Sequence, residues 1–190
     1  MNSDVYSLND ETPEEVIDYK VRTPWRMVAS MAGVIGTNGI ISADYEYVAN
    51  DNIRVEDNVG ELDYTTEDIK NYLQPSHIIR LGGEYRINPS WSLRAGYSYQ
   101  TSSTKDEVQD DQVDVYVSGS SAAYTYDRST QNITCGFGYH YKNVYFDMAY
   151  VHKYAQNNYH LFPGINDLPT VKDKVNFHNN RISATIGFRF

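Results

Sequence analysis

The sequence has one cysteine, few basic residues and no long apolar run. A single Cys among 190 residues leaves no intramolecular disulfide and no cysteine metal cluster. The 16 Lys and Arg against 25 Asp and Glu give a net charge of -9. This charge argues against a nucleic-acid-binding protein, because binding phosphates needs clustered cations. The length of 190 residues fits one ordinary domain. No stretch approaches the roughly 18 consecutive apolar residues of a membrane-spanning helix, which excludes a helical membrane protein.

Tyrosine, by contrast, is abundant, with 18 copies, and the acidic residues are unevenly distributed. Residues 1–18, 51–76 and 103–117 together carry a charge of -15, so the rest of the chain carries +6. The mean hydropathy is low, at -0.58. A low value remains compatible with a membrane β-barrel, because the strands of such a barrel are apolar only at alternate positions.

Between the acidic segments, apolar and polar residues alternate with a period of two, which is typical of β-strands. In the last stretch Ile182 and Ile186 fall on one face, and Arg181 and Ser183 fall on the other. Seven strands are predicted, at about residues 25–35, 39–48, 79–87, 91–99, 132–141, 144–150 and 180–190. The first two are the weaker ones. The sequence therefore predicts an all-β, antiparallel fold.

The connections between these strands alternate between short and long. Thr37-Asn38-Gly39, Asn88-Pro89-Ser90 and Lys142-Asn143 have the composition of tight turns. The connections at about 50–76, 102–127 and 156–176 are long and mostly acidic, and loops of this length are normally functional or disordered. A short helix is expected in the first of them, capped by Thr66 and ending before Pro75.

The alternation has two interpretations. In a soluble sandwich or lipocalin-like barrel the apolar face packs inward, whereas in an outer-membrane barrel it faces lipid. The glycines and paired charges of the polar face, the alternating loop lengths and the aromatic residues near strand ends favour the membrane interpretation. These aromatic residues are Trp25, Tyr45, Tyr47, Trp91, Tyr97, Tyr99, Tyr139 and Tyr141.

The direction of the strands follows from the loops. If the tight turns are periplasmic, both the first and the last strand run toward the periplasm. Residues 1–18 are then expected to be the remnant of an extracellular loop, and residues 19–190 the C-terminal part of a transmembrane β-barrel. An odd number of strands and the lack of a secretion signal at Met1 both predict that the chain is part of a longer protein. An eighth strand within residues 5–16 is disfavoured by its acids and Pro13.

Several motifs in order resemble one family. They are Arg22-Thr23-Pro24-Trp25-Arg26, residues 39–47 (GIISADYEY), residues 80–86 (RLGGEYR), residues 93–97 (LRAGY) and the closing residues 186–190 (IGFRF). Together they resemble the C-terminal half of FadL/TodX-type outer-membrane transporters, most closely the Bacteroidetes branch often labelled hemin receptor. The resemblance implies half of a fourteen-stranded barrel in the outer membrane of a Gram-negative bacterium. It also implies uptake of hydrophobic small molecules such as long-chain fatty acids.

The resemblance transfers only one residue role. The luminal plug and the lateral opening of this family belong to its N-terminal half, so no gating residue maps onto this sequence. The terminal Phe190 matches the C-terminal aromatic residue that the barrel assembly machinery recognises. The partners implied are therefore outer-membrane lipid, the assembly machinery and a hydrophobic substrate.

Residue patterns for catalysis, metals or cofactors are weak, and the sequence predicts neither an enzyme nor a cofactor. Cys135 falls on the apolar face of its strand, away from any pattern for nucleophilic catalysis. The histidines, at positions 77, 140, 152, 160 and 178, are scattered and no two share the spacing of metal ligands. His140 falls on the polar face and is the least implausible iron ligand, although structural packing is the favoured role.

The candidate functional residues are the charged positions of the polar face, namely Arg80, Glu84, Arg86, Arg94 and Arg189. Folding the hairpin at residues 88–90 places Glu84 opposite Arg94, and such a cross-strand pair contributes about 0.2–1 kcal/mol. A structural role for these charges is favoured over attraction of a substrate carboxylate. Two other functions remain open: a structural or adhesive barrel with partner-binding acidic loops, and a soluble lipid-binding barrel.

Overall fold

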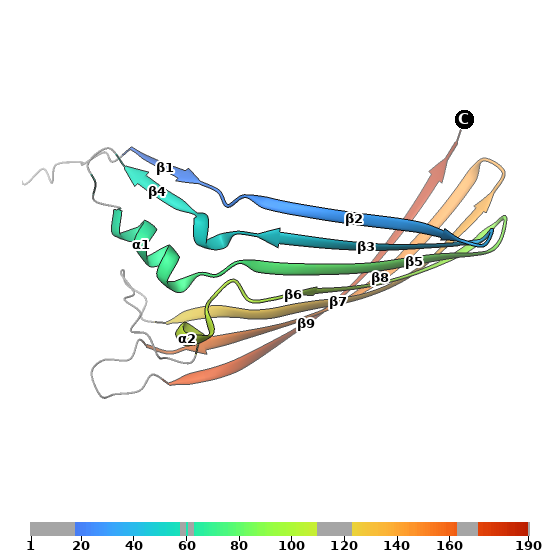
Figure 1. Cartoon of the computed structure of the whole chain (residues 1–190). Helices are drawn as coiled ribbons and strands as arrows, with labels where there is room; N and C mark the ends of the chain where they lie inside the picture. The colour runs from blue at the N-terminus through green and yellow to red at the C-terminus, as the bar shows by residue number, and fades with distance from the viewer. Residues whose placement is uncertain (1–17, 58–59, 61–62, 110–122, 163–170, 190) are drawn as a thin grey trace, which may run out of the picture.

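The computed structural model describes residues 18–57, 60, 63–109, 123–162 and 171–189. Its main feature is a curved, seven-stranded antiparallel sheet (Figure 1). The strands are β2 (Arg26–Ile35), β3 (Gly39–Val48), β5 (Ser76–Asn88), β6 (Trp91–Gln100), β7 (Tyr124–Tyr141), β8 (Val144–His160) and β9 (Lys172–Phe188). The predicted all-β, antiparallel fold and its seven strands are confirmed.

Each strand of this sheet pairs with the sheet strands that come directly before and after it along the chain, so the spatial order is β2-β3-β5-β6-β7-β8-β9. Strands β2 and β9 are the edges, and in the described part of the chain they do not pair with each other. Because consecutive strands are antiparallel and seven in number, both edge strands run toward the end of the sheet that holds the tight turns. The sheet is thus open, with two edges of the same direction.

The register assigns every strand residue to one of two faces, because directly paired residues project to the same side. Leu81 pairs with Tyr97, Tyr97 pairs with Ile133, and Leu93 pairs with Phe137. The faces predicted from the alternation are therefore correct in the six strands for which the sequence assigned them, and the register adds Met27 and Met31 of β2 to the same side as Leu81. We call the side that carries these residues the apolar face and the opposite side the polar face.

The second and third tight turns form at the predicted residues, and the first lies one residue earlier than predicted, at residues 36–38. Gly36 adopts a left-handed φ of 61° in the first turn, and Lys142 a φ of 53° in the third. In the second turn, the Asn88 side-chain oxygen accepts hydrogen bonds from the backbone N–H groups of Ser90 and Trp91, at 2.9 and 3.0 Å. These local bonds explain why Asn-Pro-Ser closes this hairpin.

The turns are staggered. Asn38 in the first turn accepts a hydrogen bond from the Arg86 backbone, and Ser90 in the second turn accepts one from the His140 backbone, both at 2.8 Å. Each turn therefore lies beside a residue of the following hairpin that comes before the turn of that hairpin. Each successive hairpin consequently extends past the one before it.

The opposite end of the sheet carries the longer connections, which are partly folded. They hold the 3₁₀ helix η1 (Asn50–Asn52), the helices α1 (Asp63–Tyr72) and α2 (Asp106–Gln109), and a two-stranded sheet of β1 (Tyr19–Arg22) and β4 (Arg54–Asp57). Two of these connections contact each other, since Lys105 donates from its backbone to Tyr72 at 3.0 Å and from its side chain to Lys70 at 2.8 Å. Neither helix is long and apolar enough to cross a membrane.

Residues 19–22 lie outside the main sheet, because β1 pairs with β4. Two sequence expectations need correction here. Thr66 lies inside α1 and does not cap it; its hydroxyl binds the Val55 backbone N–H and C=O, at 2.9 and 2.8 Å. Strands β7, β8 and β9 extend into the predicted loops, because backbone pairing continues where the apolar alternation ends. The segments at residues 5–16 and 110–122 lie outside the described residues.

Most of the buried residues lie at the end of the sheet with the long connections, and Gly138 near the tight turns is buried as well. The buried apolar residues are Val48, Ala49 and Val108, while Leu81, Leu93 and many other large apolar side chains are exposed. A single curved layer explains this distribution, since among the described elements nothing packs across the apolar face of the sheet. Whatever covers the polar and the apolar face of the sheet must therefore come from outside the described residues.

Candidate functional site

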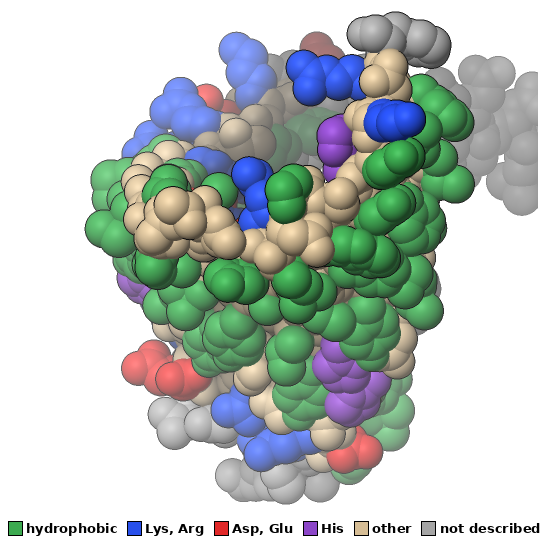
Figure 2. Space-filling view, turned by 90° about the vertical axis from the view of Figure 1, so that its right-hand side faces the viewer, with side chains coloured by type: hydrophobic (Ala, Val, Ile, Leu, Met, Phe, Trp, Pro, Cys, Tyr) green, Lys and Arg blue, Asp and Glu red, His purple; other side chains and the backbone are tan. Residues whose placement is uncertain are grey.

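The apolar face forms a continuous exposed band across the sheet. Leu93 is 50% exposed, Ile133 57% and Ile182 70%. Figure 2 looks onto the end of the sheet with the tight turns, and hydrophobic side chains cover much of the outer surface in this view. Exposed apolar surface of this extent on a folded sheet marks contact with a partner, a ligand or a membrane.

Aromatic side chains gather at both limits of this band. At the end with the long connections, the ring centroids of Trp25 and Tyr47 are 5.1 Å apart, and the Tyr45 hydroxyl lies 2.7 Å from Nδ1 of His77. At the end with the tight turns, the centroids of Trp91 and Tyr139 are 4.6 Å apart. Along β6, eight residues separate the outer aromatic residues Tyr99 and Trp91, a span of about 27 Å.

The limit of the band shifts steadily across the sheet. On β2 the apolar band begins at Met27, which lies in the same cross-strand row of paired residues as His77 of β5. On β9 it becomes apolar only at Ile182, whose row runs through Tyr150, Cys135 and Ala95 to Gly83. On β5, Gly83 lies six residues after His77. The limit of the band therefore moves by six residues along the strands between β2 and β9.

This shift measures the tilt of the strands relative to the band. Six residues correspond to about 20 Å along the strands, and the six intervals between seven strands to about 29 Å across them, which gives a tilt of about 35°. The staggered turns step in the same direction. Strands of membrane β-barrels are tilted by about 35–45°, so the band follows the course that a membrane would take around a barrel.

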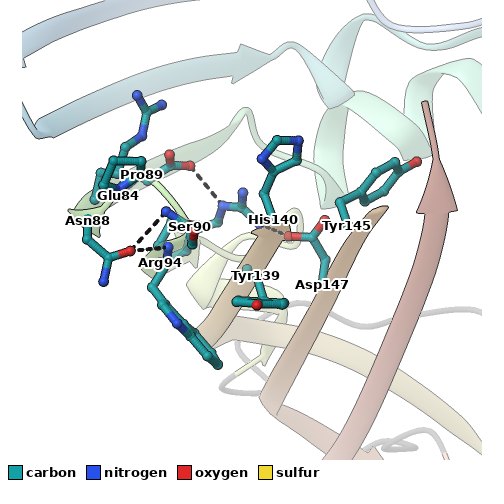
Figure 3. Close-up of a pocket in the computed structure, with 13 residues that line it drawn as sticks. Glu84, Asn88, Pro89, Ser90, Arg94, Tyr139, His140, Tyr145 and Asp147 are labelled. Atoms are coloured by element: carbon teal, nitrogen blue, oxygen red, sulfur yellow. Dashed lines mark hydrogen bonds and ion pairs between the residues drawn. The ribbon is translucent and has the colours of Figure 1, made fainter. Parts of the chain in front are cut away.

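The polar face lines the hollow side of the sheet and carries a charge network (Figure 3). Arg94 on β6 donates from Nε to Glu84 on β5 at 2.8 Å, and from Nη1 to Asp147 on β8 at 2.6 Å. The second bond crosses β7, where glycine leaves room: a Cβ on Gly138 would lie 2.7 Å from the Asp147 carboxylate oxygen. A strand without side chains at this point lets one guanidinium join three strands.

A hollow of about 360 Å³ surrounds this network at the end of the sheet with the tight turns. Beside the network, the labelled residues around it include Asn88, His140 and Tyr145 (Figure 3). Because Arg94 is already bound by two carboxylates, it is not free to attract an anion. Arg86 also lines the hollow and is the cation there to which the described structure assigns no carboxylate.

A second network lies nearer the long connections. Glu46 on β3 is 4% exposed and binds Arg80 at 2.6 Å and Arg26 at 3.1 Å. A buried carboxylate is costly unless it is paired, and the two arginines provide that pairing. Arg80 is therefore held by a structural ion pair.

The predicted site residues are thus only partly brought together. The Glu84–Arg94 pair forms as predicted, Arg80 binds Glu46 instead of joining that pair, and Arg86 lines the hollow. Arg189 lies at the tight-turn end, where its backbone N–H binds Asn143 at 2.7 Å. Phe190 lies outside the described residues, so its assembly role stays a prediction.

Sequence reasoning missed Asp147 and Glu46 as members of these networks. The alternation placed both on the polar face, but Asp147 is 53 residues away from Arg94 in sequence. Only the register of β7 against β6 and β8 determines that they meet. No signal in a single sequence gives that register across connections of this length.

The histidines are less scattered than their spacing suggests. His140 lines the polar hollow, while His77, His152 and His178 lie on the apolar face near its limit. The ring centroids of His152 and His178 are 5.6 Å apart, a contact that their spacing in the sequence does not indicate. Within the described residues, no group of three or more His, Cys, Asp or Glu is arranged to hold a metal ion.

Cys135 lies on the apolar face, as predicted, and is exposed there. Its direct neighbours across the strands are Ala95 and Tyr150, and neither is a base that would activate a thiol.

Searches of protein families, curated proteins and solved structures find nothing that matches this chain. Its resemblance to FadL/TodX transporters therefore remains a prediction from the sequence motifs.

Proposed function

We propose that the seven-stranded sheet is a sector of a transmembrane β-barrel in the outer membrane of a Gram-negative bacterium. We further propose that the complete barrel takes up hydrophobic small molecules such as long-chain fatty acids. The observation that carries the membrane proposal is the exposed apolar band, bounded by aromatic residues and inclined by about 35° to the strands. A soluble sandwich would need a second layer over this face, and the described chain offers none.

The dimensions of the band suit a bacterial outer membrane. Eight residues between Tyr99 and Trp91 span about 27 Å along β6, which at a tilt of about 35° becomes about 22 Å along the membrane normal. The apolar band of outer-membrane barrels is about 25 Å tall. Three tight turns at one end and longer, partly folded connections at the other match the periplasmic and extracellular rims of such barrels.

The open edges define what completes the barrel. Unpaired backbone groups are prohibitively costly in lipid, so β2 and β9 need partner strands. Because both edges run toward the tight turns, an all-antiparallel closure requires an odd number of further strands. Seven further strands, as in a fourteen-stranded barrel of the FadL/TodX type, satisfy this requirement, whereas a direct β2–β9 contact would be parallel.

Uptake of hydrophobic molecules rests on the motif resemblance, and the polar hollow is compatible with it. The alternative in which the barrel is structural or adhesive draws on a different observation, the folded connections that hold α1, β1 and β4. The two proposals separate in a transport assay. Uptake requires that the complete barrel admit a labelled fatty acid into liposomes, whereas an adhesive barrel leaves its entry unchanged.

The membrane proposal is tested by detergent dependence. The purified chain is refolded with and without micelles, and its β-structure is followed by circular dichroism. We expect β-structure only in micelles, because only they cover the apolar face. Folding in plain buffer with that face shielded from water would favour the soluble lipid-binding alternative and would end both the membrane and the transport proposals.

A further inference from the structure

The apolar face carries a pair of neighbouring histidines to which the proposed barrel gives no structural role. His152 on β8 and His178 on β9 are diagonal cross-strand neighbours, since His152 pairs with Asn180 and Tyr154 pairs with His178. Their ring centroids are 5.6 Å apart, with an angle of 39° between the ring planes. Both side chains are accessible, and they lie at the limit of the apolar band toward the long connections.

The separation of the rings fits one shared metal ion. A Zn–N bond of about 2.1 Å places each imidazole centroid about 3.2 Å from the ion, so two ligands at tetrahedral to trigonal angles have centroids about 5.2–5.5 Å apart. The observed 5.6 Å lies just above this range.

The tautomer of one ring is already set for binding. Nδ1 of His152 lies 2.7 Å from Oδ1 of Asn180. An amide oxygen only accepts hydrogen bonds, so Nδ1 of the neutral ring carries the proton and Nε2 keeps its lone pair. Metal-binding histidines generally donate their other ring N–H to a carbonyl or carboxylate in this way. Asn180 is held in turn by Tyr150, whose hydroxyl donates to the same oxygen at 2.7 Å.

The surroundings add no competing charge. Lys153 and Arg181, the charged residues next to the pair in sequence, fall on the polar face by the strand alternation. On the apolar face the neighbours are Tyr154, whose ring centroid is 5.0 Å from that of His178, and Ile133, the direct partner of His152. A cation at the pair therefore meets aromatic and neutral groups only.

We propose that His152 and His178 form a surface site for a divalent transition-metal ion of the copper and zinc class. Imidazole nitrogen is a preferred ligand for both ions, and Cu²⁺ binds such sites more tightly than Zn²⁺ does. Two protein ligands leave the remaining coordination positions to water. The site is independent of transport, and it ties β8 to the edge strand β9 at the level where the apolar band ends.

The test uses Cu²⁺ with the untagged chain, refolded in micelles and checked by circular dichroism. Electron paramagnetic resonance is expected to show one Cu²⁺ with two imidazole nitrogens, and Zn²⁺ is expected to displace it. His178→Asn and His152→Asn should each weaken binding at least tenfold, and Asn180→Ala should weaken it by about tenfold through the lost support of His152.

His77→Asn is the matched control, because it removes another histidine from the same face and the same limit of the band. It should leave Cu²⁺ affinity and the two-nitrogen spectrum unchanged. Equal affinity in the wild type and in His178→Asn, or an equal loss in His77→Asn, overturns the site. Neither result bears on the membrane proposal, which depends on the apolar band and not on these histidines.

Discussion

An arginine placed in the middle of the apolar band measures the solvent that this face meets. Ala95 lies on β6 halfway between Tyr99 and Trp91, and thus about 11 Å from either limit of a band about 22 Å tall. Its direct neighbours across the strands are Gly83 and Cys135, which are small. A shallow groove of about 580 Å³ runs over these residues, so Ala95→Arg has room for its side chain. Steric cost is therefore minor, and the change in free energy reports the surroundings.

In lipid, an arginine at the midplane of a barrel destabilises it by about 2–4 kcal/mol, and one near the interface by about 0–1 kcal/mol. We expect Ala95→Arg to lower the free energy of unfolding by about 3 kcal/mol, which is about two orders of magnitude in the unfolding equilibrium constant. Gln131→Arg, in the row of Tyr99 at the limit of the band, should cost about 1 kcal/mol or less. Ala95→Leu should be nearly neutral.

The assay is reversible urea unfolding of the complete barrel in lipid vesicles, because the open edges of the seven-stranded sheet are too costly in lipid, and it is followed by tryptophan fluorescence. Trp91 lies at one limit of the band and Trp25 at the other, so both report loss of the sheet from the bilayer. If the apolar face were exposed to water, Ala95→Arg would be a surface substitution within about 0.5 kcal/mol of the wild type. Equal stabilities of Ala95→Arg and Gln131→Arg would refute the depth argument.

Three further predictions concern the sheet and its connections. A double-mutant cycle of Arg94→Met and Asp147→Asn should give a coupling of about 0.5–1 kcal/mol in the unfolding assay, because both partners are partly exposed; a coupling of zero would mean that the network adds no stability. Gly187→Ala should lower the free energy of unfolding by about 1 kcal/mol or less, because the new Cβ meets only the outer end of the exposed Tyr145 ring, which can move aside, and Tyr145→Ala in the same chain should remove that loss. Thr66→Val should raise hydrogen exchange in α1 and β4 by removing two hydrogen bonds worth about 1 kcal/mol each, whereas Thr66→Ser should not.

The sequence alone predicted most of the strand architecture, because period-two alternation is a local signal. It located the hairpin that places Glu84 opposite Arg94, since a short turn fixes the register of the strands it joins. It also assigned Cys135 and Leu93 to the apolar face correctly. Where a tight turn connects two strands, the pairing and the faces follow from the sequence, except for the bulge at Ile87, which pairs Asn88 instead of Ile87 with Trp91.

Most of the contacts that the sequence did not predict cross long connections; the exception is the Arg26–Glu46 ion pair within the first hairpin. Arg94 reaches Asp147 over β7, and Glu46 meets Arg80 from a strand joined to it through α1. The pairing of His152 with His178 likewise depends on the register of β8 against β9 across residues 161–171. The ends of β7, β8 and β9 were misjudged for a related reason, because backbone hydrogen bonds continue after the membrane-like alternation has ended.

The most direct test of the membrane proposal is the distance of each face from lipid. With Cys135 replaced by Ser, a fluorophore is attached to Leu93→Cys on the apolar face or to Ser92→Cys on the polar face, and the complete barrel that contains this chain is placed in vesicles with brominated lipids. We predict strong quenching at position 93 and little at position 92, because alternate residues of β6 face opposite sides. Equal quenching at the two positions, or stronger quenching at position 92, would contradict the assignment of the apolar face to lipid.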